Sequence, residues 1–160
     1  MAIVLLDLEE TVIDSWEKRN ALPANLEKIK HFLNDNDKLG LMSWAVWDAK
    51  DKEDFQKNLQ LGLEQALEHP FTQELIFSMH DFSDVILKKK RKWVSRDDMF
   101  DLFGKEECLL QMLRLEQFTA PNIYLIDDCV DHKMTFLRNN QSVTFLNINE
   151  IDEYGRVASW

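Results

Sequence analysis

Residues 3–15 read Ile-Val-Leu-Leu-Asp-Leu-Glu-Glu-Thr-Val-Ile-Asp-Ser, and this stretch decides the fold. A short apolar run ends in a carboxylate, Asp7, and a second carboxylate, Glu9, follows two places later. Such a run predicts a buried strand whose carboxyl end opens onto a crevice, where ligands bind in parallel sheets. Asp7 is therefore a candidate nucleophile held by the sheet. Glu9, on the loop, is a candidate for supplying or removing a proton.

The rest of the chain alternates apolar strands with helical patterns. Further strands are expected over residues 39–47, 82–87, 123–126 and 143–146. Helices are expected over residues 22–33, 55–67, 71–79, 96–103, from about 105, and 131–138. This alternation favours right-handed crossovers and parallel strands. We therefore expect an α/β fold, a Rossmann-like three-layer sandwich with a mostly parallel five-stranded sheet and helices on both faces.

Length and composition indicate a single globular domain over residues 1–160, with a small helical insert at about 48–81. The hydrophobic content of 45% favours a packed core, and the apolar runs are too short to span a membrane. Two cysteines, Cys108 and Cys129, form no disulfide framework, which suits a reducing compartment. We expect a soluble, cytoplasmic protein with no membrane partner.

The net charge of −10 disfavours binding to nucleic acid and to anionic membranes. The run Lys88-Lys89-Lys90-Arg91-Lys92 is the one segment that could oppose it. Two explanations stay open for this run: a solvated charged ribbon, which we favour, and a patch that binds a polyanion.

Polar side chains gather where the expected strands end, at Asp7, Ser43 and Asp127-Asp128. Phosphoryl transfer to a carboxylate needs a positioned nucleophile, a cation that neutralises phosphate oxygens, and hydrogen-bond donors. Asp7 is the candidate nucleophile. Mg²⁺, which prefers oxygen ligands, would be held by Asp7, the backbone carbonyl of Glu9 and the Asp127-Asp128 pair. Ser43 and Lys105 are the candidates for holding the phosphate.

Four segments in order resemble the motifs of the haloacid dehalogenase-like (HAD) phosphohydrolases. They are residues 3–15; Leu39-Gly40-Leu41-Met42-Ser43; Gly104-Lys105 at the start of a helix; and Ile123-Tyr124-Leu125-Ile126-Asp127-Asp128. The resemblance implies that the Asp7 and Asp127 strands lie side by side. It also implies an aspartyl-phosphate intermediate and a capless member of the family.

Two residues depart from the family pattern Asp-x-Asp-Gly-Thr. Glu9 replaces the second Asp, and its extra methylene moves the acid by about an ångström, a displacement that can cost roughly a hundredfold in rate. Glu10 replaces Gly, which matters only if the backbone there needs a positive φ. These departures leave two functions open. One is a Mg²⁺-dependent phosphohydrolase, and the other is a weak or inactive pseudo-phosphatase that serves as a binding module.

Ordinary structural roles compete with each assignment. Asp7 can cap a turn, Asp127-Asp128 can begin a solvated loop, and Ser43 can be a small core residue. His132 invites a general-base role but is more typical of a surface histidine. Trp44 and Trp47 either pack in the core, which we favour, or line the crevice. A receiver domain is a weaker third alternative, because Asn147-Ile148-Asn149 stands where its lysine is expected.

The expected substrate is a bulky or macromolecular phosphoester, because by family analogy the chain holds no cap domain. A nucleic-acid end and a phosphoprotein both remain open as phosphorylated partners. The basic run favours the first, and the overall acidity disfavours it.

Overall fold

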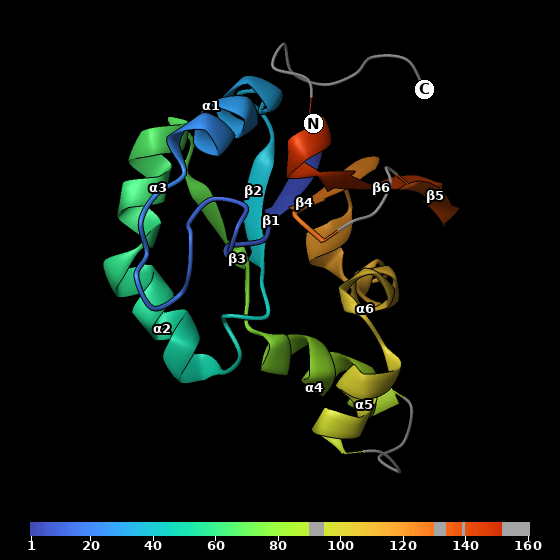
Figure 1. The fold of residues 1–160 in the computed structure, drawn as a ribbon. Coiled ribbons are helices and arrows are strands. Elements are labelled where there is room, and N and C mark those ends of the chain that lie inside the picture. The colour runs from blue at the N-terminus through green and yellow to red at the C-terminus, as the bar shows by residue number, and fades with distance from the viewer. Residues whose placement is uncertain (90–94, 130–133, 139, 152–160) are drawn as a thin grey trace.

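The computed structural model describes residues 1–89, 95–129, 134–138 and 140–151. One six-stranded sheet runs through its centre in the order β3-β2-β1-β4-β6-β5 (Figure 1). The strands are β1 (Ala2–Leu6), β2 (Lys38–Met42), β3 (Phe71–Phe77), β4 (Asn122–Asp127), β5 (Met134–Arg138) and β6 (Gln141–Asn147). Every neighbouring pair is parallel except β5 and β6. The expected α/β fold is confirmed, with an antiparallel edge strand added to five parallel ones.

Strand β1 is buried along its whole length because it lies in the middle of the sheet. Its alternate side chains enter two separate apolar cores, with Ile3 and Leu5 in one and Val4 and Leu6 in the other. The first core is closed by α4 (Met79–Lys89), α5 (Arg96–Leu102) and α6 (Lys105–Met112), and the second by α1 (Pro23–Phe32), α2 (Ala49–Asn58) and α3 (Gln60–Leu67). The two helical layers make the three-layer sandwich (Figure 1).

Local signals place several helix ends where the sequence predicts them. Pro23 opens α1, and the Ser95 side chain accepts a hydrogen bond from the Asp98 backbone N–H at 3.1 Å at the start of α5. The single helix expected over 55–67 is instead two helices, α2 and α3, which meet at Leu59. Two short 3₁₀ turns, Glu116–Phe118 and Ile148–Glu150, complete the described elements.

Three expectations about the type of element are wrong. Residues 71–77 form edge strand β3 rather than a helix, since pairing with β2 buries Phe71 and residues 75–77 while residues 72–74 between them stay partly or fully exposed. Residues 82–87 belong to helix α4 rather than to a strand, since the buried Phe82 and Ile86 are four residues apart. Residues 134–138 form β5 rather than a helix, and residues 131–133 lie outside the described part of the chain.

The segment expected as a helical insert, residues 48–81, holds α2, α3, strand β3 and the start of α4. It therefore contributes a strand to the central sheet as well as two helices to one layer. The strand expected over 39–47 is shorter, since β2 ends at Met42 and a loop follows. No helix in the described ranges is both long and apolar enough to cross a membrane.

Candidate active site

Strands β1 and β4 bring the two main acidic segments together at the carboxyl edge of the sheet. The strands are adjacent and parallel, with Leu6 opposite Ile126, and the Asp7 backbone N–H continues the ladder by donating to the Ile126 carbonyl at 3.0 Å. Asp7 and Asp127 thus lie side by side because they follow residues that share one register position. The β2 strand on the other side of β1 places Ser43 at the same edge.

All six residues proposed from the sequence line one cavity of about 630 Å³ at this edge. They are Asp7, Glu9, Ser43, Lys105, Asp127 and Asp128. The residues come from the ends of β1, β2 and β4, the loops that follow them, and the first turn of α6. Open α/β sheets place ligands in such a crevice beyond the strand ends. The structure therefore brings together the groups that the sequence pattern selected.

Lys105 joins the two aspartates directly. Its Nζ donates to Asp7 Oδ1 at 2.8 Å and to Asp127 Oδ2 at 2.5 Å. The three side chains are 5%, 8% and 6% exposed, so this ion-paired group is almost closed to solvent. A buried charge that loses its partner costs several kcal/mol, so the three groups depend on one another.

Protonation in this group follows from burial and charge together. Burial favours the neutral form of Lys105, but the charges of Asp7 and Asp127 outweigh it and raise the pKa of the ammonium. Burial, together with repulsion by Asp127, raises the pKa of Asp7 against the opposing effects of Lys105 and Thr11. At Asp127 burial is likewise the largest influence, yet the combined effects of Lys105 and the hydrogen bonds hold its pKa below the ordinary value. Lys105 is therefore a protonated donor.

The remaining carboxylate oxygens have partners that fix their orientation. Thr11 Oγ1 donates to Asp7 Oδ2 at 3.1 Å, and the Cys129 backbone N–H donates to Asp127 Oδ1 at 3.0 Å. Thr11 is fully buried and was not selected from the sequence as a site residue. Its position four residues after Asp7, in the turn after the strand, is the signal that could have identified it.

The acidic groups of the cavity outnumber its positive charges. Lys105 is the one basic residue among the lining residues that the structure describes, and it faces Asp7, Asp127 and Asp128 together with Glu9 and Glu10. Burial, hydrogen bonds to Asp127 and Glu10, and repulsion by neighbouring carboxylates raise the pKa of Asp128 to about 7. The cavity thus carries negative charge that one ammonium does not neutralise.

This donor set fits Mg²⁺. The ion prefers oxygen ligands, and carboxylates from two adjacent strand ends and a backbone carbonyl on the loop after β1 are ligands of that kind. Asp127, Asp128 and the exposed Cys129 bring their ligand atoms within 4.8 Å of one another, and of these the two carboxylates suit Mg²⁺ whereas the thiol does not. A divalent cation held by Asp7, Asp127, Asp128 and the Glu9 carbonyl would relieve the excess negative charge.

Glu9 and Glu10 differ in how they meet the cavity. The Glu9 side chain is exposed and accepts a hydrogen bond from the Trp16 backbone N–H at 3.1 Å through Oε2, so the loop itself holds this carboxylate. Glu10 has a φ of 60°, the left-handed conformation that favours glycine. The glycine position of the resembled motif therefore keeps its glycine-like backbone here, although the residue is Glu.

Ser43 is buried at the end of β2, and its hydroxyl accepts a hydrogen bond from the Ala45 backbone N–H at 3.3 Å. The loop that follows is tied to the start of α4, where the Met79 and His80 backbone N–H groups donate to the Val46 and Trp47 carbonyls, each at 2.9 Å. These bonds hold Ser43 and the next residue, Trp44, at the cavity.

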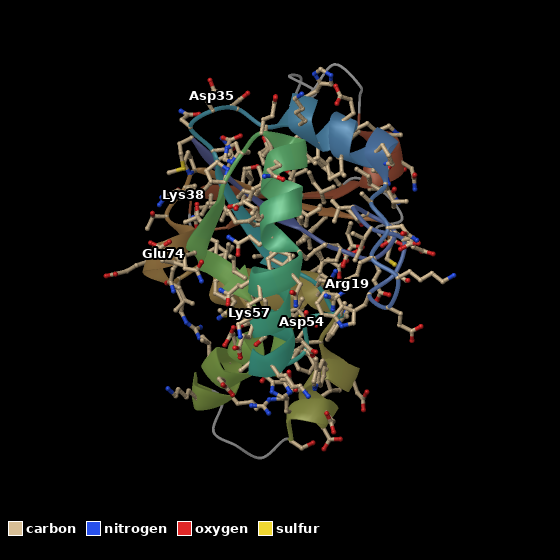
Figure 2. All side chains as sticks on the ribbon, turned by 90° about the vertical axis from the view of Figure 1, so that its left-hand side faces the viewer. Arg19, Asp35, Lys38, Asp54, Lys57 and Glu74 are labelled. Atoms are coloured by element: carbon tan, nitrogen blue, oxygen red, sulfur yellow. The ribbon has the colours of Figure 1, made fainter. Side chains whose placement is uncertain are left out.

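The loop from Glu9 to Leu22 is hydrogen-bonded to helix α2, in the layer formed by α1, α2 and α3. Arg19 makes two hydrogen bonds to the Asp54 carboxylate on α2, at 2.9 and 2.6 Å. Figure 2 shows the two side chains beside each other, with Arg19 coming from the loop and Asp54 from the helix. The guanidinium also stacks on the Trp16 ring at 3.9 Å, and its bonds to the carboxylate hold the pKa of Asp54 well below the ordinary value. Arg19 and Asp54 were not selected from the sequence.

Two candidates fall partly or wholly outside this description. Lys90, Arg91 and Lys92 of the basic run and His132 lie outside the described residues, and the described Lys88 is exposed on α4. Comparison with known proteins adds no relative, since no family model matches the chain and no curated protein matches it. The geometry of the cavity and the resemblance of the four motifs are therefore the basis for assigning a function.

Proposed function

We propose that the chain is a Mg²⁺-dependent phosphohydrolase of the HAD type that acts through an aspartyl-phosphate. The observation that supports the proposal best is the bridge from Lys105 to Asp7 and Asp127. Residues 98 and 22 positions away from the lysine meet it, with their side chains buried, at a cavity that Ser43 also lines. Ionisable groups in a cleft, with pKa values shifted by burial and by specific charged partners, mark a candidate functional site.

The proposed reaction has two displacements. A carboxylate oxygen of Asp7 attacks phosphorus, the phosphorus–oxygen bond of the ester breaks, and Glu9 gives its proton to the leaving oxygen. Water then attacks the aspartyl-phosphate while Glu9 takes up its proton, which releases inorganic phosphate and restores Asp7. Ser43 and Lys105 donate hydrogen bonds to phosphate oxygens as charge develops on them.

Mg²⁺ would be held by Asp7, Asp127, Asp128 and the backbone carbonyl of Glu9, and when bound it neutralises the charge of the phosphate oxygens. The protein's own part is to orient these ligands. Thr11 and the Cys129 N–H do this by holding one oxygen of each aspartate.

The proposed substrate class is a bulky or macromolecular phosphoester, with a nucleic-acid end or a phosphoprotein as its source. Helices α2 and α3 support this class, because none of the cavity-lining residues in the described ranges comes from them. They pack on the sheet face instead of closing over the cavity. The loops at the rim of the cavity therefore control access to it.

A direct test measures phosphate release from a generic phosphomonoester with Mg²⁺ and with a chelator. We expect Mg²⁺-dependent release that Asp7→Asn abolishes, because the amide cannot act as the nucleophile. Asp35→Asn is the matched control, since Asp35 is an exposed aspartate at the turn between α1 and β2 and lines no part of the cavity (Figure 2). Equal rates in the wild type and Asp7→Asn would reject the proposal.

The second candidate function is a binding module on the same scaffold. The hydrogen bond from the Trp16 N–H to Glu9 favours it, because a carboxylate held by its own loop is less free to exchange protons with a substrate. The variant Glu9→Gln separates the two functions. An enzyme should lose about a hundredfold in kcat, the lower end of a general acid–base contribution. A binding module should show no Mg²⁺-dependent turnover in either protein and equal phosphate binding in both.

A further inference from the structure

Trp44 is an exposed aromatic side chain at the candidate active site. It follows Ser43 directly, lines the same cavity as Asp7 and Lys105, and is 39% exposed. Large aromatic side chains usually bury most of their surface, so an exposed indole beside polar groups leaves apolar area unused. Neither the proposed chemistry nor the packing of the core accounts for this exposure.

Two aromatic side chains, Trp47 and Phe100, pack against the indole and hold it in place. Its ring is stacked with Trp47 at a centroid distance of 6.3 Å and is nearly perpendicular to the Phe100 ring at 5.0 Å. Trp47 also contacts Phe100 at 5.0 Å and His80 at 5.2 Å, so the support is itself packed. Trp47 is partly buried against the apolar core, whereas Trp44 reaches the cavity. A ring supported in this way loses little conformational entropy when a ligand packs on it.

The charges around the cavity restrict what such a ligand carries. Glu9, Glu10, Asp14 and Glu106 also line the cavity, so a chain of phosphates would meet repulsion beyond the proposed phosphate position. A neutral ring next to one phosphate meets no such penalty. The acidic rim and the apolar indole therefore favour the same ligand, a single phosphate with an aromatic group.

We propose that Trp44 is a stacking surface for an aromatic ring carried by the phosphoester, so that the preferred substrates carry an aryl group or a nucleobase close to a single phosphate. This inference rests on the proposed function, because it places the phosphate between Ser43 and Lys105. The shared chemistry is a flat ring close to one phosphate. A phosphotyrosine side chain carries its ring on the ester oxygen, and a nucleotide carries its ring beyond the sugar.

The test measures binding of non-hydrolysable phosphonates to the wild-type chain with Mg²⁺ by calorimetry, so that turnover is not needed. The probes are benzylphosphonate, the 5′-phosphonate analogue of adenosine, butylphosphonate as the ligand without a ring, and inorganic phosphate. The variants are Trp44→Leu, which removes the ring, and Trp44→Phe, which keeps one. We expect Trp44→Leu to weaken binding of at least one ring-bearing probe about tenfold, equivalent to about 1.4 kcal/mol.

Butylphosphonate and inorganic phosphate should bind equally well to the wild type and both variants, and Trp44→Phe should recover most of the lost affinity. The ring-bearing probe that weakens in Trp44→Leu identifies the source of the ring. Equal affinity of all phosphonates for the wild type and Trp44→Leu, with phosphate still bound, would overturn this inference alone. Absence of binding by any probe, phosphate included, would overturn it together with the proposed function.

Discussion

Glu10 has a backbone conformation that suits glycine better than glutamate. Its φ of 60° lies in the left-handed region, where a side chain costs about 1–2 kcal/mol relative to the right-handed one. The turn persists because Glu10 N–H donates to the Ile13 carbonyl at 2.7 Å and three further N–H groups, from Thr11 to Ile13, donate to the Leu8 carbonyl. The loop thus holds Glu10 in a strained conformation at the edge of the cavity.

The variant Glu10→Gly should raise the free energy of unfolding by up to about 1 kcal/mol, because glycine adopts the positive φ without strain. Urea unfolding followed by circular dichroism measures the change. Glu10→Ala is the control, since it removes the same carboxylate from the acidic cavity and keeps the Cβ atom. A gain from alanine equal to the gain from glycine would assign the effect to charge and contradict the strain.

At the scale of the elements, Gly40 governs how closely three strands approach. A Cβ atom at Gly40 would meet Leu5 Cδ2 and the Leu75 carbonyl oxygen at 2.6 Å and Leu75 Cβ at 2.7 Å. These neighbours belong to β1 and β3 on either side, and the pairing of β2 with β3 shifts register between Leu39 and Leu41. Two of the three contacts are to a backbone atom and a Cβ atom, which cannot turn away as a flexible side chain can.

The variant Gly40→Ala should lower the free energy of unfolding by about 1–3 kcal/mol, the usual cost of overfilling a packed core. Gly62→Ala is the matched control, because Gly62 lies inside helix α3 with nothing within 4 Å of a Cβ atom. At that position alanine should raise the free energy of unfolding by about 0.5–1 kcal/mol. Denaturant midpoints of the two variants measure both effects, and a neutral Gly40→Ala would show that the strands can separate freely.

The elements also show what sequence reasoning can and cannot predict. Strands β1, β4 and β6 were predictable because buried parallel strands read as continuous apolar runs. Strand β3 was missed because its residues Thr72 to Glu74 lie on a partly exposed edge and interrupt the apolar signal. Strand β5 was missed because it pairs antiparallel with β6 at the other edge, where the alternation of strands and helices no longer holds.

At the scale of the whole molecule, one edge of the sheet gathers the candidate site. The placement of Asp7, Ser43 and Asp127 was predictable because each follows an apolar strand, and strand ends converge in parallel sheets. The choice of Lys105 as a site residue depended on the resemblance to the HAD motifs. Thr11 could have been found from its place in the turn after β1, whereas Arg19 was not predictable, because its contact with Asp54 depends on a loop conformation that no periodicity specifies.

Mg²⁺ should stabilise the folded chain, because an ion that binds only the folded state adds about 2.7 kcal/mol at a hundred times its Kd. For a chain of this length each kcal/mol raises Tm by about 2–4 °C. Thermal unfolding followed by circular dichroism measures the shift. Asp128→Asn should reduce it, since one carboxylate ligand is lost from the proposed set.

Sodium chloride at equal ionic strength is the control, because any salt screens the self-repulsion of a chain with a net charge of −10. A shift of the same size in sodium chloride, or in Asp128→Asn with Mg²⁺, would argue against a specific ion site.

The ion pair between Arg19 and Asp54 predicts which residues should vary together in evolution. Helix α2 contributes no lining residue to the cavity within the described ranges, yet its Asp54 secures the segment that bears Glu9. Selection for turnover would therefore act on helix α2 as well as on the cavity. Arg19 and Asp54 should covary among related sequences.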